Sequence, residues 1–243
     1  MQILGLALLA FVVWYGFADR SGATAISAFD SHALVMVLGG SLAAILISST
    51  ARTTWRTFSC LRELLPGLGV LPPETAALED ERAQLAALWR EGRRAQAVEL
   101  AEGSRFPAIQ RMLPLVLERA PDEATKAAFT ELTHDTLGRW QPAIGNWEVL
   151  SKLAPSFGMV GTITGMVALF RDMGGDTSEL GSSISLALLA TLYGVAFGAG
   201  VAGPIGHYLR GLLDERLGAL ERCEQTVCEL VARAARGGSG ASG

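Results

Sequence analysis

Four stretches of the chain are apolar throughout and contain no Asp, Glu, Lys or Arg. They run over residues 1–18, 33–51, 153–170 and 181–206. A helix needs roughly 20 apolar residues to cross the hydrocarbon core of a bilayer, so each stretch predicts a transmembrane helix. Short polar loops separate the first from the second and the third from the fourth. The pattern therefore predicts two helical hairpins that flank one long polar block.

Composition agrees with this pattern. Half of the 243 residues are hydrophobic, only 18% are charged, and the mean hydropathy is +0.33. Soluble domains carry about 25% charged residues. We expect an all-α membrane protein with four transmembrane helices in two hairpins and a helical cytosolic domain between spans 2 and 3. The formal charge of −4 lacks the basic footprint of nucleic-acid-binding proteins, so no nucleic-acid partner is expected.

The distribution of Lys and Arg predicts the orientation. The two short loops hold one basic residue each, Arg20 and Arg171, whereas the segments near the other span ends hold eight. Because cytoplasmic loops carry the excess of positive charge, both termini and the polar block are expected in the cytosol. One alternative is that the first span is a cleaved signal peptide, with an A-x-A site at residues 23–25. Its apolar run is longer than the usual 7–15 residues.

The polar block, residues 52–152, shows helical periodicity and no strand alternation. Apolar residues recur from Leu78 to Trp89, and a second run follows Gly92. Prolines at 107, 114 and 121 are expected to cut the remainder into short helices. Leucines from 209 to 220 extend the fourth helix into the cytosol. We therefore divide the chain into hairpin 1 (1–51), the cytosolic domain (52–152), hairpin 2 (153–208) and a helical extension with a flexible tail (209–243).

The second hairpin carries mostly small residues at spacings of four and three on one face of each helix. One face of its first helix has Gly158, Thr162, Gly165 and Leu169, and one face of its second has Ala187, Thr191, Gly194 and Gly198. Such faces let membrane helices approach closely. The two threonines either bond only to carbonyls of their own helices or line a path for water or an ion. No span carries an Asp or Glu, so a conducting complex needs a partner that supplies the titrating group.

Two segments of this hairpin resemble a known family. Residues 154–166 read APSFGMVGTITGM, and residues 187–194 read ALLATLYG, with Gly203-Pro204 further on. These are similar to the third- and fourth-helix signatures of the MotA/TolQ/ExbB family, and the four-span layout resembles its MotA branch. The resemblance implies a multi-pass protein of the bacterial inner membrane that conducts H⁺ or Na⁺ without a cofactor and is not an enzyme.

The resemblance also implies an assembly and roles for particular residues. It implies a homo-pentamer around a dimer of a MotB/ExbD/TolR-like single-span protein, with a possible rotor protein on the cytosolic side. Each partner would bring one intramembrane Asp. The implied roles are the ion pathway for Thr162, Thr191, Ser156 and Gly158, coupling for Pro155 and Pro204, and rotor contact for Arg90 and Glu99.

Simpler interpretations of these residues remain open. The two prolines also fit a kink or a first-turn position, and the charged residues Arg90 and Glu99 also fit a solvated helix face. Three functions follow in order: an ion-driven stator subunit of flagellar type, an ExbB/TolQ-like energiser of outer-membrane processes, and a non-conducting membrane scaffold. The sequence contains no metal cluster, phosphate loop or paired nucleophile and base, so no catalytic residue is assigned.

Overall fold

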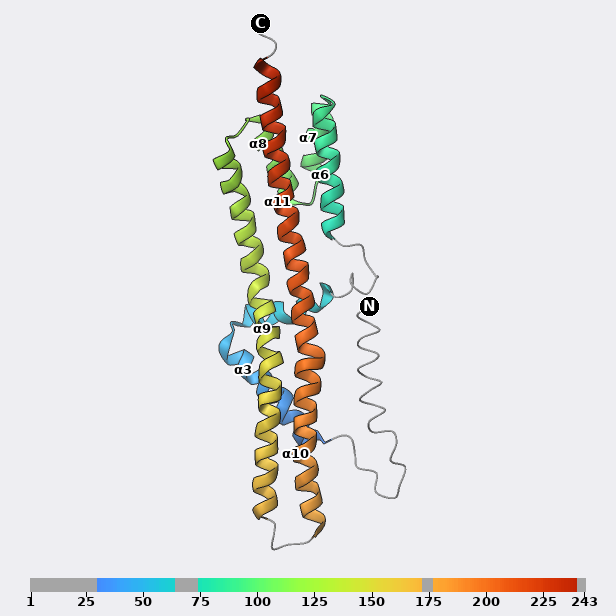
Figure 1. The fold of residues 1–243 in the computed structure, drawn as a ribbon, viewed down its shortest axis with the longest axis vertical. Coiled ribbons are helices and arrows are strands. Elements are labelled where there is room, and N and C mark those ends of the chain that lie inside the picture. Colours follow the sequence, from blue (N-terminus) through green and yellow to red (C-terminus); the bar gives the residue numbers. More distant parts are fainter. Residues whose placement is uncertain (1–29, 64–73, 172–176, 240–243) are drawn as a thin grey trace, which may run out of the picture. The chain divides into compact units, whose positions relative to one another are not determined.

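The computed structural model describes residues 30–63, 74–171 and 177–239, and in these ranges every regular element is a helix (Figure 1). The predicted first span, residues 1–18, lies outside the described residues, as does the turn at Gly174-Gly175. By its internal contacts the chain divides into two compact units. Unit 1 comprises residues 1–68 and 142–210, and unit 2 comprises residues 69–141 and 211–243.

The described part of unit 1 begins at Asp30 and continues into one apolar helix over Ser31–Ser48. It consists of α2 (Ser31–Leu34), a π-helical turn η1 (Val35–Gly39) and α3 (Gly40–Ser48). The Asp30 carboxylate caps its start by accepting bonds from the backbone N–H of His32 at 2.8 Å and Ala33 at 3.2 Å. A short amphipathic helix, α4 (Ala51–Ser59), follows, and then the 3₁₀ turn η2 (Cys60–Glu63).

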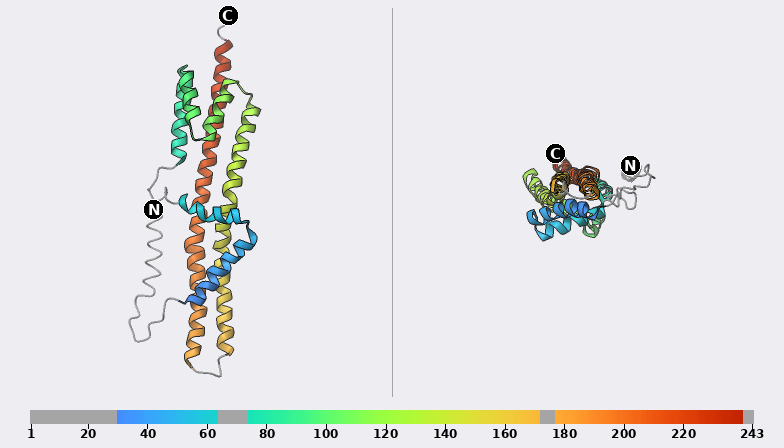
Figure 2. Two further views of the ribbon diagram at one scale, coloured as in Figure 1. Left: turned by 180° about the vertical axis from the view of Figure 1, so that it is seen from behind. Right: turned by 90° about the horizontal axis from the view of Figure 1, so that it is seen from below.

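The predicted second hairpin forms the rest of unit 1. It is made of the C-terminal part of α9 (Asp122–Arg171), α10 (Thr177–Phe197), a π-helical turn η3 (Gly198–Ala202) and the start of α11 (Gly203–Ser239). Helices α9 and α10 lie side by side in both views (Figures 1 and 2). Three stretches of helix among the described residues are long and apolar enough to cross a membrane: 31–48, 122–171 and 181–235.

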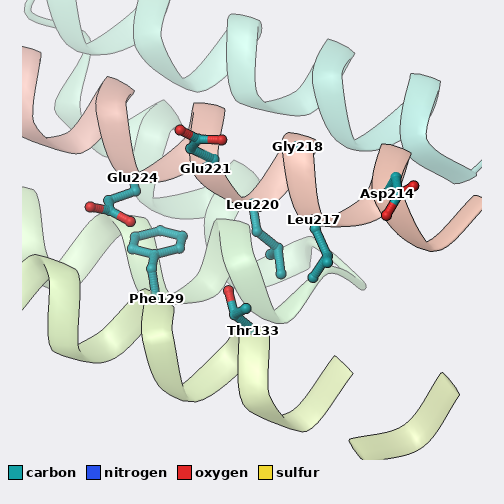
Figure 3. A pocket seen from close by; sticks show the side chains of 8 residues that line it. All are labelled: Phe129, Thr133, Asp214, Leu217, Gly218, Leu220, Glu221 and Glu224. Atoms are coloured by element: carbon teal, nitrogen blue, oxygen red, sulfur yellow. The ribbon is translucent and has the colours of Figure 1, made fainter. Parts of the chain in front are cut away.

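Unit 2 is a helical cluster built on α6 (Glu74–Arg90), α7 (Arg94–Gly103) and α8 (Pro107–Leu117), together with the start of α9 and the end of α11. The predicted break at Gly92 is confirmed, and its φ of +76° explains why glycine stands between α6 and α7. The buried core includes Leu85, Met112, Phe129 and Val227. Phe129 and Thr133 of α9 point toward Leu217 and Leu220 of α11 beside a pocket of about 500 Å³ (Figure 3).

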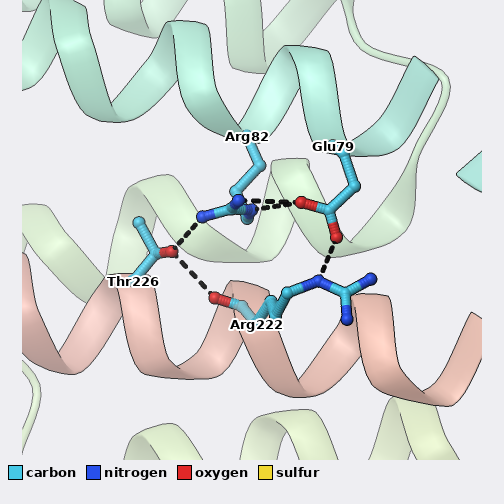
Figure 4. A network of polar contacts seen from close by, with 4 residues as sticks. All are labelled: Glu79, Arg82, Arg222 and Thr226. Carbon is cyan, nitrogen blue, oxygen red and sulfur yellow. Dashed lines mark hydrogen bonds and ion pairs between the residues drawn. The ribbon is translucent and has the colours of Figure 1, made fainter. Parts of the chain in front are cut away.

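Polar contacts join α6 to α11 within unit 2 (Figure 4). The Glu79 carboxylate accepts a bond from the Nε of Arg82 at 2.9 Å and pairs with Arg222. Arg82 also donates to the Thr226 hydroxyl at 2.8 Å. Burial alone would raise the pKa of Glu79, but the two guanidinium groups outweigh it and hold that pKa below its usual value.

One prediction about the polar block was wrong. Pro107 does open α8 and Pro121 does precede α9, but Pro114 lies inside α8 without ending it. The stretch from Asp122 onward is not a short helix, because α9 runs unbroken through Pro142 to the end of the predicted third span. Pro142 has no backbone N–H and therefore costs the helix one hydrogen bond. The burial of the neighbouring side chains of Trp140, Ile144 and Trp147 offsets this cost.

Candidate functional site

The interface between α9 and α10 in unit 1 is a seam of glycines in backbone contact. A Cβ added to Gly194 would lie 2.6 Å from the carbonyl oxygen of Ala154 and 3.1 Å from the Cα of Gly158. A Cβ added to Gly165 would lie 2.9 Å from the carbonyl oxygen of Ser183. No side chain fits at these positions, so the small-residue faces that the spacing predicts do meet each other, as expected for closely packed membrane helices.

The sequence interpretation overlooked one member of the seam. Gly161 is buried, and a Cβ added to it would lie 2.3 Å from the Cβ of Ala190. It was missed because the face was traced as a single series from Gly158 through Thr162 to Gly165, whereas Gly161 follows Gly158 by three. Residues at i+3 and i+4 share one helix face, so both spacings together would have included it.

Thr162 and Thr191 lie within this seam and hydrogen-bond to each other across it. The Thr162 hydroxyl also lies 3.2 Å from the carbonyl oxygen of Gly158 in its own helix and 3.4 Å from that of Ala187 in α10. The Thr191 hydroxyl lies 3.3 Å from the carbonyl of Ala187 and 3.5 Å from that of Gly158. Each hydroxyl therefore lies within bonding distance of a carbonyl in its own helix and of acceptors in the neighbouring helix, and the two protons can form two of these bonds at a time. The alternative that each threonine bonds only to a carbonyl of its own helix therefore does not account for all of these contacts.

The other predicted residues of the ion pathway and coupling group lie around this pair. Gly158 is buried and supplies a carbonyl to both threonines. The Ser156 hydroxyl instead donates to the carbonyl of Lys152 in its own helix at 3.0 Å, and the described structure does not bring it to the threonine pair. The second hairpin's described part contains no Asp, Glu, Lys or Arg from 153 to 170 or from 181 to 206.

The two prolines occupy different positions. Pro155 lies well inside α9, where its ring faces the π-helical turn η3: a Cβ added to Gly198 would lie 2.6 Å from the Pro155 Cδ. Pro204 is the second residue of α11, directly after η3, and is exposed. Pro155 is therefore not at a first-turn position, whereas Pro204 follows a change of helix type. Pro204 has no backbone N–H, so it cannot donate the hydrogen bond by which an α-helix would continue from the preceding turn.

The two charged residues of the predicted rotor contact lie in unit 2 and do not meet. Arg90 ends α6, is exposed and pairs with Glu229 of α11 at 3.7 Å. Glu99 is exposed in α7, beyond the turn at Gly92. Among the described residues, no group of three or more His, Cys, Asp or Glu side chains is arranged to hold a metal ion.

Known proteins share both the sequence and the fold of this chain. The model of the family described as the MotA/TolQ/ExbB proton channel family matches residues 102–222, about half of the chain. The chain is 57% identical over 88 residues to Motility protein A of Borreliella burgdorferi, covering 36% of this chain and 34% of that protein. It spans about a third or less of the length of the first curated relatives it matches.

Two solved structures have the same fold. The structure of C. jejuni MotAB matches with a TM-score of 0.79 at 15% identity, covering 95% of this chain and 88% of that one. The flagellar MotAB stator complex from Bacillus subtilis matches with a TM-score of 0.77 at 19% identity, covering 94% and 88%. Identities this low establish likeness of fold alone.

Proposed function

The chain belongs to the MotA/TolQ/ExbB proton channel family, and from that premise we propose that it is the ion-conducting subunit of a flagellar-type motility stator. The observation that carries the proposal is the hydroxyl pair of Thr162 and Thr191, set in a seam of glycines inside the region that the family model matches. The similarity to Motility protein A favours motility over an ExbB-like role.

The proposed mechanism divides the chemistry between this chain and a partner. The second hairpin offers hydroxyl and carbonyl oxygens but no Asp, Glu, His, Lys or Arg between 153 and 170 or between 181 and 206. A single-span partner must therefore bring the carboxylate that binds and releases H⁺ or Na⁺. Binding neutralises that carboxylate and lets it pass the apolar surface. The membrane potential contributes about 2.3 kcal/mol per charge per 100 mV, which biases the steps in one direction.

The proposal includes a topology and an assembly. We place four spans in the bacterial inner membrane with both termini in the cytosol, on the strength of the apolar stretches and the Lys/Arg asymmetry. Five copies would surround a dimer of the partner, and Arg90 and Glu99 would face a rotor protein. The MotAB composition of the two similar structures supports a partner of this kind. Pro155, which packs on Gly198, would transmit motion at the base of the seam.

The experiment is ion uptake into vesicles that hold the purified complex with its single-span partner. Thr162→Val and Thr191→Val keep the side-chain shape and remove the hydroxyl, so assembly should survive. If a hydroxyl helps to hold the ion, its loss removes one bond to a charged group, worth about 1.5–3 kcal/mol. Uptake should then fall by about tenfold or more.

Thr164→Val is the matched control. Thr164 lies in the same helix, is exposed, and donates to the carbonyls of Gly161 at 2.9 Å and Val160 at 3.1 Å without bonding to either seam threonine. Its variant should conduct as the wild type does. Normal uptake by both seam variants would remove the hydroxyl pair from the mechanism. A wild-type complex of correct size that conducts nothing would favour the scaffold hypothesis instead.

A further inference from the structure

Helix α4 is a short helix of unit 1 with one buried face and one exposed face. It starts at Ala51, directly after the apolar helix that ends at Ser48, and it runs across α9 rather than along it (Figures 1 and 2). An apolar helix long enough to span a membrane thus leads straight into a short helix that lies transverse to the neighbouring span.

One face of α4 is buried against α9 by specific polar bonds. Thr54 and Thr57, three residues apart, are both buried. The Thr57 hydroxyl accepts a bond from the Asn146 amide at 2.8 Å, and the Thr57 carbonyl accepts one from the indole Nε1 of Trp147 at 3.0 Å. The Asn146 side-chain oxygen in turn accepts a bond from Ser49 at 2.8 Å. These contacts fix the rotation of α4, so its opposite face is a defined surface.

That opposite face carries aromatic and basic residues. Trp55 is 76% exposed, although it is a large apolar side chain. Phe58, which is 44% exposed, lies at the edge of the buried face, where its ring packs edge-on against that of Trp147 of α9 with 6.2 Å between the ring centroids. Arg52 is exposed and Arg56 is half-buried, and neither forms an ion pair with any described residue. The sequence contains no acidic residue between Asp30 and Glu63. The face therefore combines exposed aromatic surface with two uncompensated positive charges.

We propose that α4 is an interfacial helix that binds the acidic phospholipids of the cytosolic leaflet. Helices that combine Trp or Phe with Arg on neighbouring sides lie in the plane of the membrane surface. Trp and Tyr concentrate at the level of the headgroups because their rings are apolar and their N–H or O–H groups are polar. Trp55 enters the boundary between headgroups and acyl chains, while Arg52 and Arg56 contact lipid phosphates.

Two observations favour lipid over a protein partner as the occupant. The helix is continuous in sequence with a membrane span, so it starts at the depth where headgroups lie. Its two charges have the sign that complements anionic lipids, and each basic residue near such a surface contributes roughly fivefold in binding. The inference needs only that residues 31–48 cross the membrane. It is independent of whether the chain conducts ions.

The test measures quenching of tryptophan fluorescence by lipids that carry bromine near the headgroup end of the acyl chain. The full chain, with its five tryptophans, is reconstituted in vesicles of phosphatidylcholine and phosphatidylglycerol, with one or the other lipid brominated at equal mole fraction. Trp55→Phe should remove part of the quenched emission. The matched control Trp89→Phe, in α6 of unit 2, should not.

The arginines test the preference for acidic lipid. Brominated phosphatidylglycerol should quench Trp55 more than brominated phosphatidylcholine does. The double variant Arg52→Gln/Arg56→Gln should abolish that difference, whereas Arg90→Gln/Arg93→Gln should keep it. All four substitutions leave the buried bonds of Thr57 intact, so helicity and oligomer size should match the wild type.

Two results would overturn the proposal. If Trp55→Phe leaves the quenching unchanged, the indole does not meet lipid, and a neighbouring subunit or a partner protein covers it. If both brominated lipids quench the wild type equally, the helix meets the membrane without selecting acidic headgroups, and the roles assigned to Arg52 and Arg56 are wrong.

Discussion

The glycine seam predicts that adding one methyl group to Gly194 will destabilise the protein. The added Cβ would lie 2.6 Å from the carbonyl oxygen of Ala154, and real Cβ atoms do not come closer than 3.0 Å to another heavy atom. The contact is too short by 0.4 Å, the difference between these two distances. Because the neighbours are backbone atoms, including the Cα of Gly158 at 3.1 Å and of Pro155 at 3.2 Å, no side chain can turn aside. Helices α9 and α10 must separate.

The magnitude follows from two opposing effects. Overpacking typically costs about 1–3 kcal/mol, since a gap of even ~0.5 Å forfeits about a quarter of each dispersion contact along the interface. Against this, Ala is favoured over Gly in a helix by about 1 kcal/mol. Gly181→Ala separates the two effects, because Gly181 lies in the same helix and a Cβ there meets nothing within 4 Å. The difference in unfolding free energy between the variants should therefore be about 1–3 kcal/mol.

The assay is unfolding of the chain in mixed micelles as the fraction of a denaturing detergent increases, followed by tryptophan fluorescence and circular dichroism. Gly194→Ala should unfold at a lower detergent fraction than the wild type, and Gly181→Ala at an equal or higher fraction. If the two variants unfold at the same detergent fraction, α9 and α10 are not in backbone contact at Gly194, and the close packing described for the seam is wrong.

Two further predictions concern polar groups elsewhere. The pKa of Glu79 is lowered, so its ion pairs stabilise the fold at a pH above the ordinary pKa of 4.5, and this stability is lost as the pH falls through the lowered pKa. Glu79→Gln should therefore make the thermal stability less dependent on pH on the acid side. An unchanged pH profile would count against these ion pairs. Asn146→Leu breaks the bonds of Asn146 to Thr57 and Ser49 and should cost about 1–3 kcal/mol of unfolding free energy. Gln141 is exposed, so the control Gln141→Leu should cost little. Equal losses in the two variants would mean that the bonds of Asn146 do not stabilise the fold.

Local patterns were enough to predict part of this structure. The break at Gly92 was predictable because a glycine interrupts two runs of helical periodicity, and it adopts a φ that other residues avoid. The facing of Gly158 and Gly194 was predictable because small residues recur at a helical spacing, and membrane helices associate through close van der Waals packing of such faces. The same reasoning extended the fourth helix beyond Leu209 correctly.

Other features depend on contacts between residues far apart in the chain. The continuity of α9 through Pro142 could not be inferred from a proline that usually ends helices, because the compensating burial of Ile144 and Trp147 is tertiary. The bond from Trp147 to the Thr57 carbonyl crosses 90 residues, so no local pattern contains it. The π-helical turn before Pro204 is likewise invisible in hydrophobic periodicity.

The hydroxyl pair also limits how the stator proposed above could work. Thr162 and Thr191 have two hydroxyl protons between them and four acceptors in reach: the carbonyls of Gly158 and Ala187 and each other's oxygen. Exchanging these bonds moves no backbone atom and costs about one net hydrogen bond, roughly 0.5–1.5 kcal/mol. A unit charge crossing 100 mV gains about 2.3 kcal/mol, which exceeds that cost. The potential can therefore redirect the hydroxyls as a carboxylate passes.

Separating helices α9 and α10 along the glycine seam would cost more than reorienting the two hydroxyls. Separating α9 from α10 would lose the close contacts at Gly158, Gly161, Gly165, Gly194 and Gly198 together. It would also remove the bonds of the threonine hydroxyls across the seam. In a conducting complex the two helices consequently stay in contact while the hydroxyls reorient, so the larger movement has to occur between this hairpin and the partner that carries the charge.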